Sequence, residues 1–149
     1  MHRDEYLARL EALYAGYLKT VQELEDNRKL GEGMFGFKGG PADNPCHDRF
    51  AEDLRAMLAD FAAAGPDSAD VRALLESIYA APRRFPRPRT AMWMLLAVHG
   101  LTAILIPLLE KEDAAALRKS YAAAYKRWER LPVQQQILRA LEQAASNGR

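Results

Sequence analysis

Apolar residues recur every three or four positions along most of this chain, which is the spacing of one face of an α-helix. Residues from Arg3 to about Leu30 carry the longest such pattern. Leu13 and Leu18 lie beside the main row of apolar positions and widen it into a stripe. A wide stripe suits a helix bundle better than a two-stranded coil. We therefore expect a long amphipathic first helix, with a seam formed by Leu7, Leu10, Tyr14, Tyr17, Val21 and Leu24.

Capping and helix-breaking residues divide the rest of the chain into shorter helices. Asn44 has the character of an N-cap and Pro45 that of a first helical residue, so a second helix should begin there. The dipeptide Gly65-Pro66 should end it, and a third helix should follow from Asp67 or Ser68. A fifth helix is expected over residues 112–130, and a short sixth helix should begin at residue 132.

The segment of residues 91–109 is the most apolar part of the chain and carries no charge. A helix that is apolar on every side is either the buried centre of a bundle or a membrane span. His99, Gly100, Thr102 and Pro107 all lie inside this segment and make insertion into a bilayer unfavourable. The other amphipathic helices also need an apolar element to pack on. We therefore expect a buried helix and no association with membranes.

These patterns contain no strand-like alternation of useful length and no internal repeat. The sequence predicts an all-α, single-domain bundle of five or six helices around an apolar central helix at about residues 90–109. A glycine-rich loop over residues 31–44 joins the first two helices. The helical domain should cover residues 1–146, and residues 147–149 should form a frayed tail.

The amino-acid composition indicates the class of protein but does not indicate a function. The chain has 149 residues, of which 49% are hydrophobic and 28% are charged, as in a globular domain. A net charge of +1 favours neither a nucleic-acid binder nor a protein with an acidic partner. One cysteine excludes an internal disulfide, and the charged amino terminus lacks an apolar signal core. We expect a cytoplasmic protein with no cofactor and no metal.

The glycine-rich loop holds five of the nine glycines within residues 31–40. Its first six residues match G-x-G-x-x-G, but the strand that nucleotide-binding versions require is missing. The loop leads to a helix amino terminus, which favours anions, so one interpretation is a phosphate or carboxylate pocket. The other is a compact connection whose Met34, Phe35 and Phe37 fill the core. The pocket would be formed by Gly36, Lys38, Gly39, Gly40, Asn44 and His47.

Cys46 and His99 are the candidate catalytic residues. A thiol near a helix amino terminus ionises more easily, and a nucleophile needs a base within hydrogen-bond reach. His99 could serve as that base if the loop folds onto the central helix. The alternative is structural, with Cys46 a small buried thiol, His47 a surface or capping residue, and His99 bonded to a carbonyl or a tyrosine.

Four arginines and three prolines lie together between residues 82 and 89. Prolines hold a chain extended, and Phe85 could stack on a base, so this linker could bind a polyanion such as RNA. Alternatively, it is a rigid connection whose arginines pair with neighbouring acids or cap carbonyls. The candidate ligand-binding residues here are Arg83, Arg84 and Arg87.

The length of the first seam favours one function over the others. A six-position seam can exceed what a small bundle covers, so we expect an association module, acting with itself or a protein partner through the first helix. The alternative is a binder of a small anionic ligand, or an enzyme, with a pocket between the glycine-rich loop and His99. Polyanion binding by the arginine–proline linker is a third possibility, although the overall charge argues against nucleic acid.

Overall fold

The computed structural model describes residues 3–26, 45–84, 98–125 and 131–147. Every regular element in these ranges is helical, so the predicted all-α bundle is confirmed. The elements are α1 (Arg3–Asp26), α2 (Pro45–Ala63), α3 (Ser68–Ala80), the 3-10 helices η2 (Ala81–Arg84), η4 (His99–Ile104) and η5 (Ile106–Leu108), α5 (Lys111–Ala124) and α6 (Pro132–Asn147).

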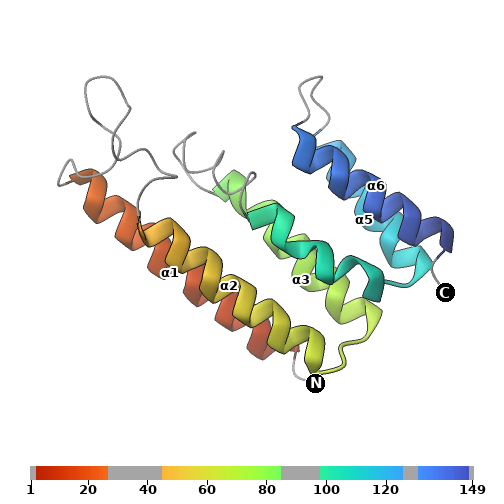
Figure 1. Ribbon diagram of the computed structural model, residues 1–149, viewed down its shortest axis with the longest axis horizontal. Helices are drawn as coiled ribbons and strands as arrows, with labels where there is room; N and C mark the ends of the chain where they lie inside the picture. Colours follow the sequence, from red (N-terminus) through yellow and green to blue (C-terminus); the bar gives the residue numbers. More distant parts are fainter. Residues whose placement is uncertain (1–2, 27–44, 85–97, 126–130, 148–149) are drawn as a thin grey trace.

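The helices lie side by side in an antiparallel bundle (Figure 1). α1 packs on α2, α5 packs on α6, and α3 with η4 and η5 lies between these two pairs. α3 contacts both α1 and α5, while η4 contacts α2, α3 and α6. The end of α1, the start of α2 and the end of α3 therefore lie at the same end of the bundle (Figure 1).

The apolar seam of α1 is covered by other helices of the same chain. Tyr14 and Tyr17 both pack against Phe50 of α2, with ring centroids 5.7 and 4.6 Å apart. Tyr6 meets Phe61 edge to face at 5.1 Å. Leu10, Tyr14, Tyr17 and Val21 are all buried. These described positions of the seam are therefore occupied within the bundle.

Most predicted helix boundaries agree with the structure. α2 begins at Pro45, and the chain turns after it at Gly65, whose φ of 71° lies in the left-handed region that glycine adopts without strain. α3 begins at Ser68, and the side chain of Asp67 caps it by accepting a hydrogen bond of 2.8 Å from the Asp70 amide. α1 is described as far as Asp26, so its predicted last turn lies outside the described residues.

The central apolar segment differs from the regular helix that we expected. Its described part consists of two short 3-10 helices separated at Leu105. Pro107 has no amide hydrogen and cannot continue an α-helical ladder, which accounts for the tight second turn. The segment is also not buried on every side, because Ile104 is 50% exposed and Leu108 is 41% exposed. Residues 91–97 of the predicted helix lie outside the described residues.

The last two helices differ from their predicted lengths. α5 is described from Lys111 to Ala124, and the predicted remainder to residue 130 is mostly outside the described residues. α6 is not short, because it has 16 residues and continues to Asn147, one residue into the tail that we expected to fray. Within the part of the chain that the structure describes, no helix has the length and hydropathy needed to cross a membrane.

Candidate functional site

A cluster of polar aromatic residues lies in the core between α3, η4 and α5. α3 contributes Tyr79, α5 contributes Tyr121, and Tyr125 is the residue that directly follows the last turn of α5. η4 contributes His99 and Thr102, which the 3-10 geometry places on the same side of the turn. Tyr79, His99, Thr102 and Tyr121 are all buried. We call these five residues the tyrosine–histidine cluster.

Hydrogen bonds connect the members of the tyrosine–histidine cluster. The hydroxyls of Tyr79 and Thr102 are 2.9 Å apart, and Thr102 also donates to the His99 carbonyl at 2.7 Å. Nδ1 of His99 lies 3.1 Å from the Tyr121 hydroxyl. The Tyr125 hydroxyl donates to the Tyr79 carbonyl, in the last turn of α3, where backbone carbonyls lack helical partners. These bonds join three elements through side chains.

Burial changes the ionisation of two members of the cluster. It lowers the pKa of His99 to about 3, because the charged imidazolium would lose its hydration. It also raises the pKa of Tyr79, although the hydrogen bond with Thr102 opposes that shift. Both groups are therefore neutral near pH 7. The second ring nitrogen of His99, Nε2, is buried and has no hydrogen-bond partner in the part of the chain that the structure describes.

A groove of about 340 Å³ runs between α3 and α5 above this cluster. Three tyrosines of the cluster line it, and their rings pack at angles, with Tyr79 and Tyr121 centroids 4.9 Å apart and Tyr121 and Tyr125 centroids 4.8 Å apart. Arg72 and Glu76 are the charged residues among the described residues that line the groove. Its full described lining is Arg72, Glu76, Tyr79, Ala80, Leu117, Ser120, Tyr121, Ala124 and Tyr125.

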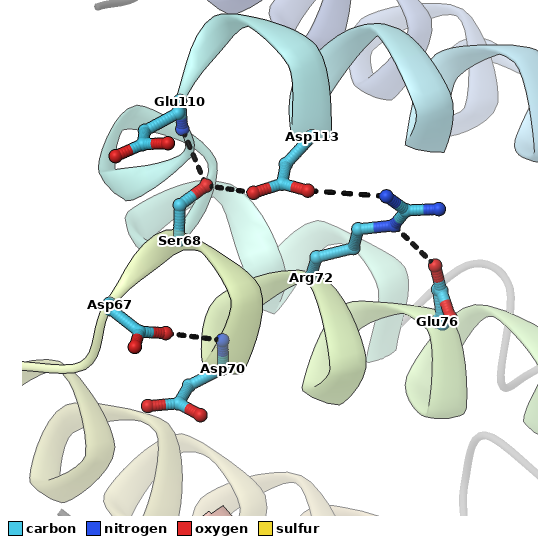
Figure 2. Close-up of polar contacts among 7 residues, drawn as sticks. All are labelled: Asp67, Ser68, Asp70, Arg72, Glu76, Glu110 and Asp113. Atoms are coloured by element: carbon cyan, nitrogen blue, oxygen red, sulfur yellow. Dashed lines mark hydrogen bonds and ion pairs between the residues drawn. The ribbon is translucent and has the colours of Figure 1, made fainter.

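A polar network connects the groove to the start of α5 (Figure 2). Ser68 accepts a hydrogen bond of 2.7 Å from the Glu110 amide and donates one of 2.5 Å to Asp113. Asp113 in turn pairs with Arg72, and Arg72 pairs with Glu76. The Ser68 bond and then the Arg72 charge lower the pKa of Asp113, while its partners Glu76 and Asp113 raise that of Arg72. The network thus fixes the Arg72 guanidinium.

A second buried histidine lies at the start of α2. Nδ1 of His47 is 2.5 Å from the Tyr17 hydroxyl, and its ring meets Tyr17 edge to face. Burial lowers the pKa of His47 to about 4, and the neighbouring Asp48 opposes this shift. His47 is fully buried, so the expectation of a surface or capping histidine is wrong. The reason is that α1 packs across the start of α2 and covers this side chain.

The structure describes only part of the predicted site. Cys46 is the second residue of α2, as expected, but its side chain lies outside the described part of the molecule. Arg83 and Arg84 belong to η2, and their side chains are likewise not described. His99 is bonded to a tyrosine, which is one of the two partners predicted for it. The remaining candidates, Gly36, Lys38, Gly39, Gly40, Asn44 and Arg87, lie outside the described residues.

Sequence reasoning did not assign the three tyrosines around His99 to a common site. These residues are Tyr79, Tyr121 and Tyr125. The available signal was the combination of Tyr121 and Tyr125 on one helical face with a histidine in an otherwise apolar segment, since buried hydroxyls need partners. Among the described residues, no group of three or more His, Cys, Asp or Glu residues is arranged to hold a metal ion.

Comparison with known proteins adds no functional assignment. No protein-family model matches the sequence, and no curated protein or solved structure shows significant similarity to it.

Proposed function

We propose that this protein binds a small organic molecule in the groove between α3 and α5. The observation that supports this most strongly is the buried His99 ring, which packs against the three tyrosines that line the groove and whose Nε2 atom has no hydrogen-bond partner among the described residues. An unpaired buried polar group costs about 1–3 kcal/mol, so a bundle core gains no stability from it. Buried polar groups with shifted pKa values beside a concave surface are typical of binding sites.

The groove has the size and lining that small molecules require. Its volume of about 340 Å³ falls at the lower end of the range for ligand pockets, which is about 300–1,000 Å³. The rings of Tyr121 and Tyr125 supply apolar contact area, and the Ser120 hydroxyl at the edge supplies a polar atom. This location differs from the pocket that we predicted beside the glycine-rich loop, which lies outside the described residues.

The test is a fragment screen by amide NMR with a variant that fills the groove. We expect at least one fragment to shift the amides of Tyr79, Tyr121 and Tyr125. Ala124 is exposed and lines this groove, so Ala124→Phe should block that binding. Ala12 is also exposed and lines a different groove, between α1 and α2, so Ala12→Phe is the matched control. No shifted groove amide in a broad library, or binding unchanged by Ala124→Phe, would contradict the proposal.

Self-association is the second candidate, supported by an apolar surface on η4 and η5. Ile104 and Leu108 are four residues apart and are exposed. Beside them is a groove of about 330 Å³ that is lined by Ala103, Ile106, Pro107, Leu109, Ala140, Gln143 and Ala144. Exposed large apolar side chains next to an uncharged groove are typical of protein contacts. This surface is a different one from the α1 face that the sequence indicated, whose described positions Leu10, Tyr14, Tyr17 and Val21 are buried within the chain.

Light scattering at tens of micromolar protein tests the association proposal. A mass above that of one chain is expected, and it should return to one chain in Ile104→Lys and Leu108→Lys. Ala59→Lys adds the same charge at an exposed position of α2 and should leave the mass unchanged. A wild-type mass equal to one chain would reject association through this surface.

A further inference from the structure

We propose that the ligand of the α3–α5 groove is a neutral planar molecule with a carbonyl oxygen that Arg72 binds. This inference rests on the proposed function and adds the chemical class of the ligand. It differs from the anionic ligand that the sequence indicated, since that expectation depended on residues such as Lys38 and Arg87 that lie outside the described part of the chain.

The two charges that line the groove are paired with each other. Nε of Arg72 donates to Oε1 of Glu76 at 2.7 Å, and Nη1 donates to Oδ1 of Asp113 at 3.2 Å (Figure 2). One guanidinium therefore faces two carboxylates. Among the described lining residues, no charge is left to neutralise an ionic ligand. These three groups together carry an excess negative charge, which repels an anion, and a cation that approached either carboxylate would meet the Arg72 guanidinium that contacts both of them.

The rest of the lining favours an aromatic body without charge. Transferring an ion from water onto tyrosine rings removes part of its hydration, and no unpaired charge in the described lining compensates for this loss. A neutral planar ring loses little hydration and gains contact with Tyr121 and Tyr125. Aromatic rings also favour offset or edge contacts with other rings, which the inclined tyrosines offer.

Arg72 supplies a donor with a fixed position. Its Nε and Nη1 atoms are held by carboxylates, but Nη2 has no hydrogen-bond partner among the described residues. Figure 2 shows the Arg72 guanidinium between Asp113 and Glu76, joined to each carboxylate by one hydrogen bond. A guanidinium is planar and can only donate hydrogen bonds, so the ligand atom that Nη2 contacts must be a hydrogen-bond acceptor such as an oxygen. A carbonyl oxygen meets this requirement without bringing a charge.

Three probes of nearly equal shape test the charge of the ligand: benzamide, benzoate and benzamidinium. Their affinities are measured by NMR titration of the groove amides at pH 7. Benzamide should bind at least about threefold more tightly than either ion, a difference of the size expected for one exposed charge interaction. Arg72→Lys should weaken benzamide binding by a similar factor, because an ammonium keeps the charge but not the planar donor edge.

Glu76→Gln removes one carboxylate from an exposed position and leaves Arg72 less neutralised. Benzoate should then bind about two- to fivefold more tightly than it binds the wild type, whereas benzamide should change little. Asp60→Asn is the matched control, because it unpairs Arg9 on a distant part of the surface.

The outcomes of the titrations distinguish a failure of the neutral-ligand inference from a failure of the proposed function. Equal or tighter binding of benzoate or benzamidinium to the wild type would overturn the neutral-ligand inference and leave the groove as a binding site. Failure of all three probes, while the fragment screen finds other ligands, would also overturn only the inference. Failure of both experiments would reject the binding site itself.

Discussion

Nδ1 of His99 lies 3.1 Å from the Tyr121 hydroxyl, whereas Nε2 of the same ring is buried and no described residue bonds it. A neutral imidazole has one donor and one acceptor, so one of these two capacities is unused whichever atom donates to the other. The charged imidazolium would be less stable here than the neutral ring, because burial removes its hydration. Burial therefore lowers the pKa of His99 to about 3. His99 is therefore one of the two buried histidines through which the fold should respond to acid.

The first prediction is a loss of stability in mild acid. The unfolded chain binds a proton on each histidine near pH 6.5, but the folded chain binds it only near pH 3 at His99 and near pH 4 at His47. Below pH 6.5 the unfolded state holds more protons, so the free energy of unfolding falls as the pH falls. Each buried histidine should contribute a loss of about 2 kcal/mol between pH 7 and pH 5, measured by urea denaturation.

Substitution of one histidine shows which residue is responsible. In His99→Met the loss between pH 7 and pH 5 should be smaller by about 2 kcal/mol, because the remaining titration is that of His47. A Lys→Met change on the surface, such as Lys119→Met, should leave the wild-type pH dependence in place. An unchanged pH dependence in His99→Met would mean that this ring titrates in the folded protein as it does in the unfolded chain.

The second prediction concerns Ser68, whose hydroxyl joins the first turns of α3 and α5. Ser68→Ala removes the acceptor of the Glu110 amide and the donor to Asp113. We expect a destabilisation of about 1–2 kcal/mol in urea denaturation. The pKa of the Asp113 carboxyl should also rise, because the Ser68 bond is the largest cause of its lowering. NMR titration of the Asp113 side chain measures this, and an unshifted pKa would contradict the role given to Ser68.

The fold was largely predictable because its signals are local. The spacing of Leu10, Tyr14 and Tyr17 identifies one helix face, and Asp67 marks a helix start through a bond three residues away. The central segment was harder to predict, because hydropathy does not distinguish an α-helix from 3-10 turns. Pro107 was the one local sign of that difference, and we interpreted it only as an argument against a membrane span.

The candidate site was less predictable because its residues come from distant parts of the chain. Tyr79 and His99 are 20 positions apart, and Tyr121 is 22 positions from His99. No local pattern brings them together, since their contacts depend on how three helices pack. His47 shows the same limit, because its burial is decided by Tyr17, 30 positions earlier. The sequence identified both histidines as notable but could not assign their neighbours.

The third prediction contrasts two glycines. Gly65 has a φ of 71°, and an alanine there would be strained although space is available for its side chain. Gly16 lies within α1, and a side chain there would also meet nothing within 4 Å. Gly65→Ala should therefore destabilise the protein by about 1 kcal/mol, whereas Gly16→Ala should stabilise it by about 0.5–1 kcal/mol. Thermal melts of both variants measure the sign of each change in stability. A change of the same sign in both variants would contradict this account.

The fourth prediction separates the role of the His99–Tyr121 pair in stability from its role in binding. Removing one partner of a buried hydrogen bond leaves the other unsatisfied, whereas replacing both with apolar groups is nearly neutral. Tyr121→Phe should cost about 1–3 kcal/mol at pH 7 because it leaves Nδ1 of His99 without this bond. The double variant His99→Met with Tyr121→Phe should recover most of that loss, as measured in a double-mutant cycle by urea denaturation.

Ligand binding in the double variant then distinguishes a structural pair from a functional one. The double variant keeps every side chain that lines the groove except the Tyr121 hydroxyl, so its shape should be nearly unchanged. If the tyrosine–histidine cluster serves binding, fragments found in the wild type should bind the double variant more weakly, although its stability is restored. Binding equal to that of the wild type would mean that the buried pair only ties η4 to α5.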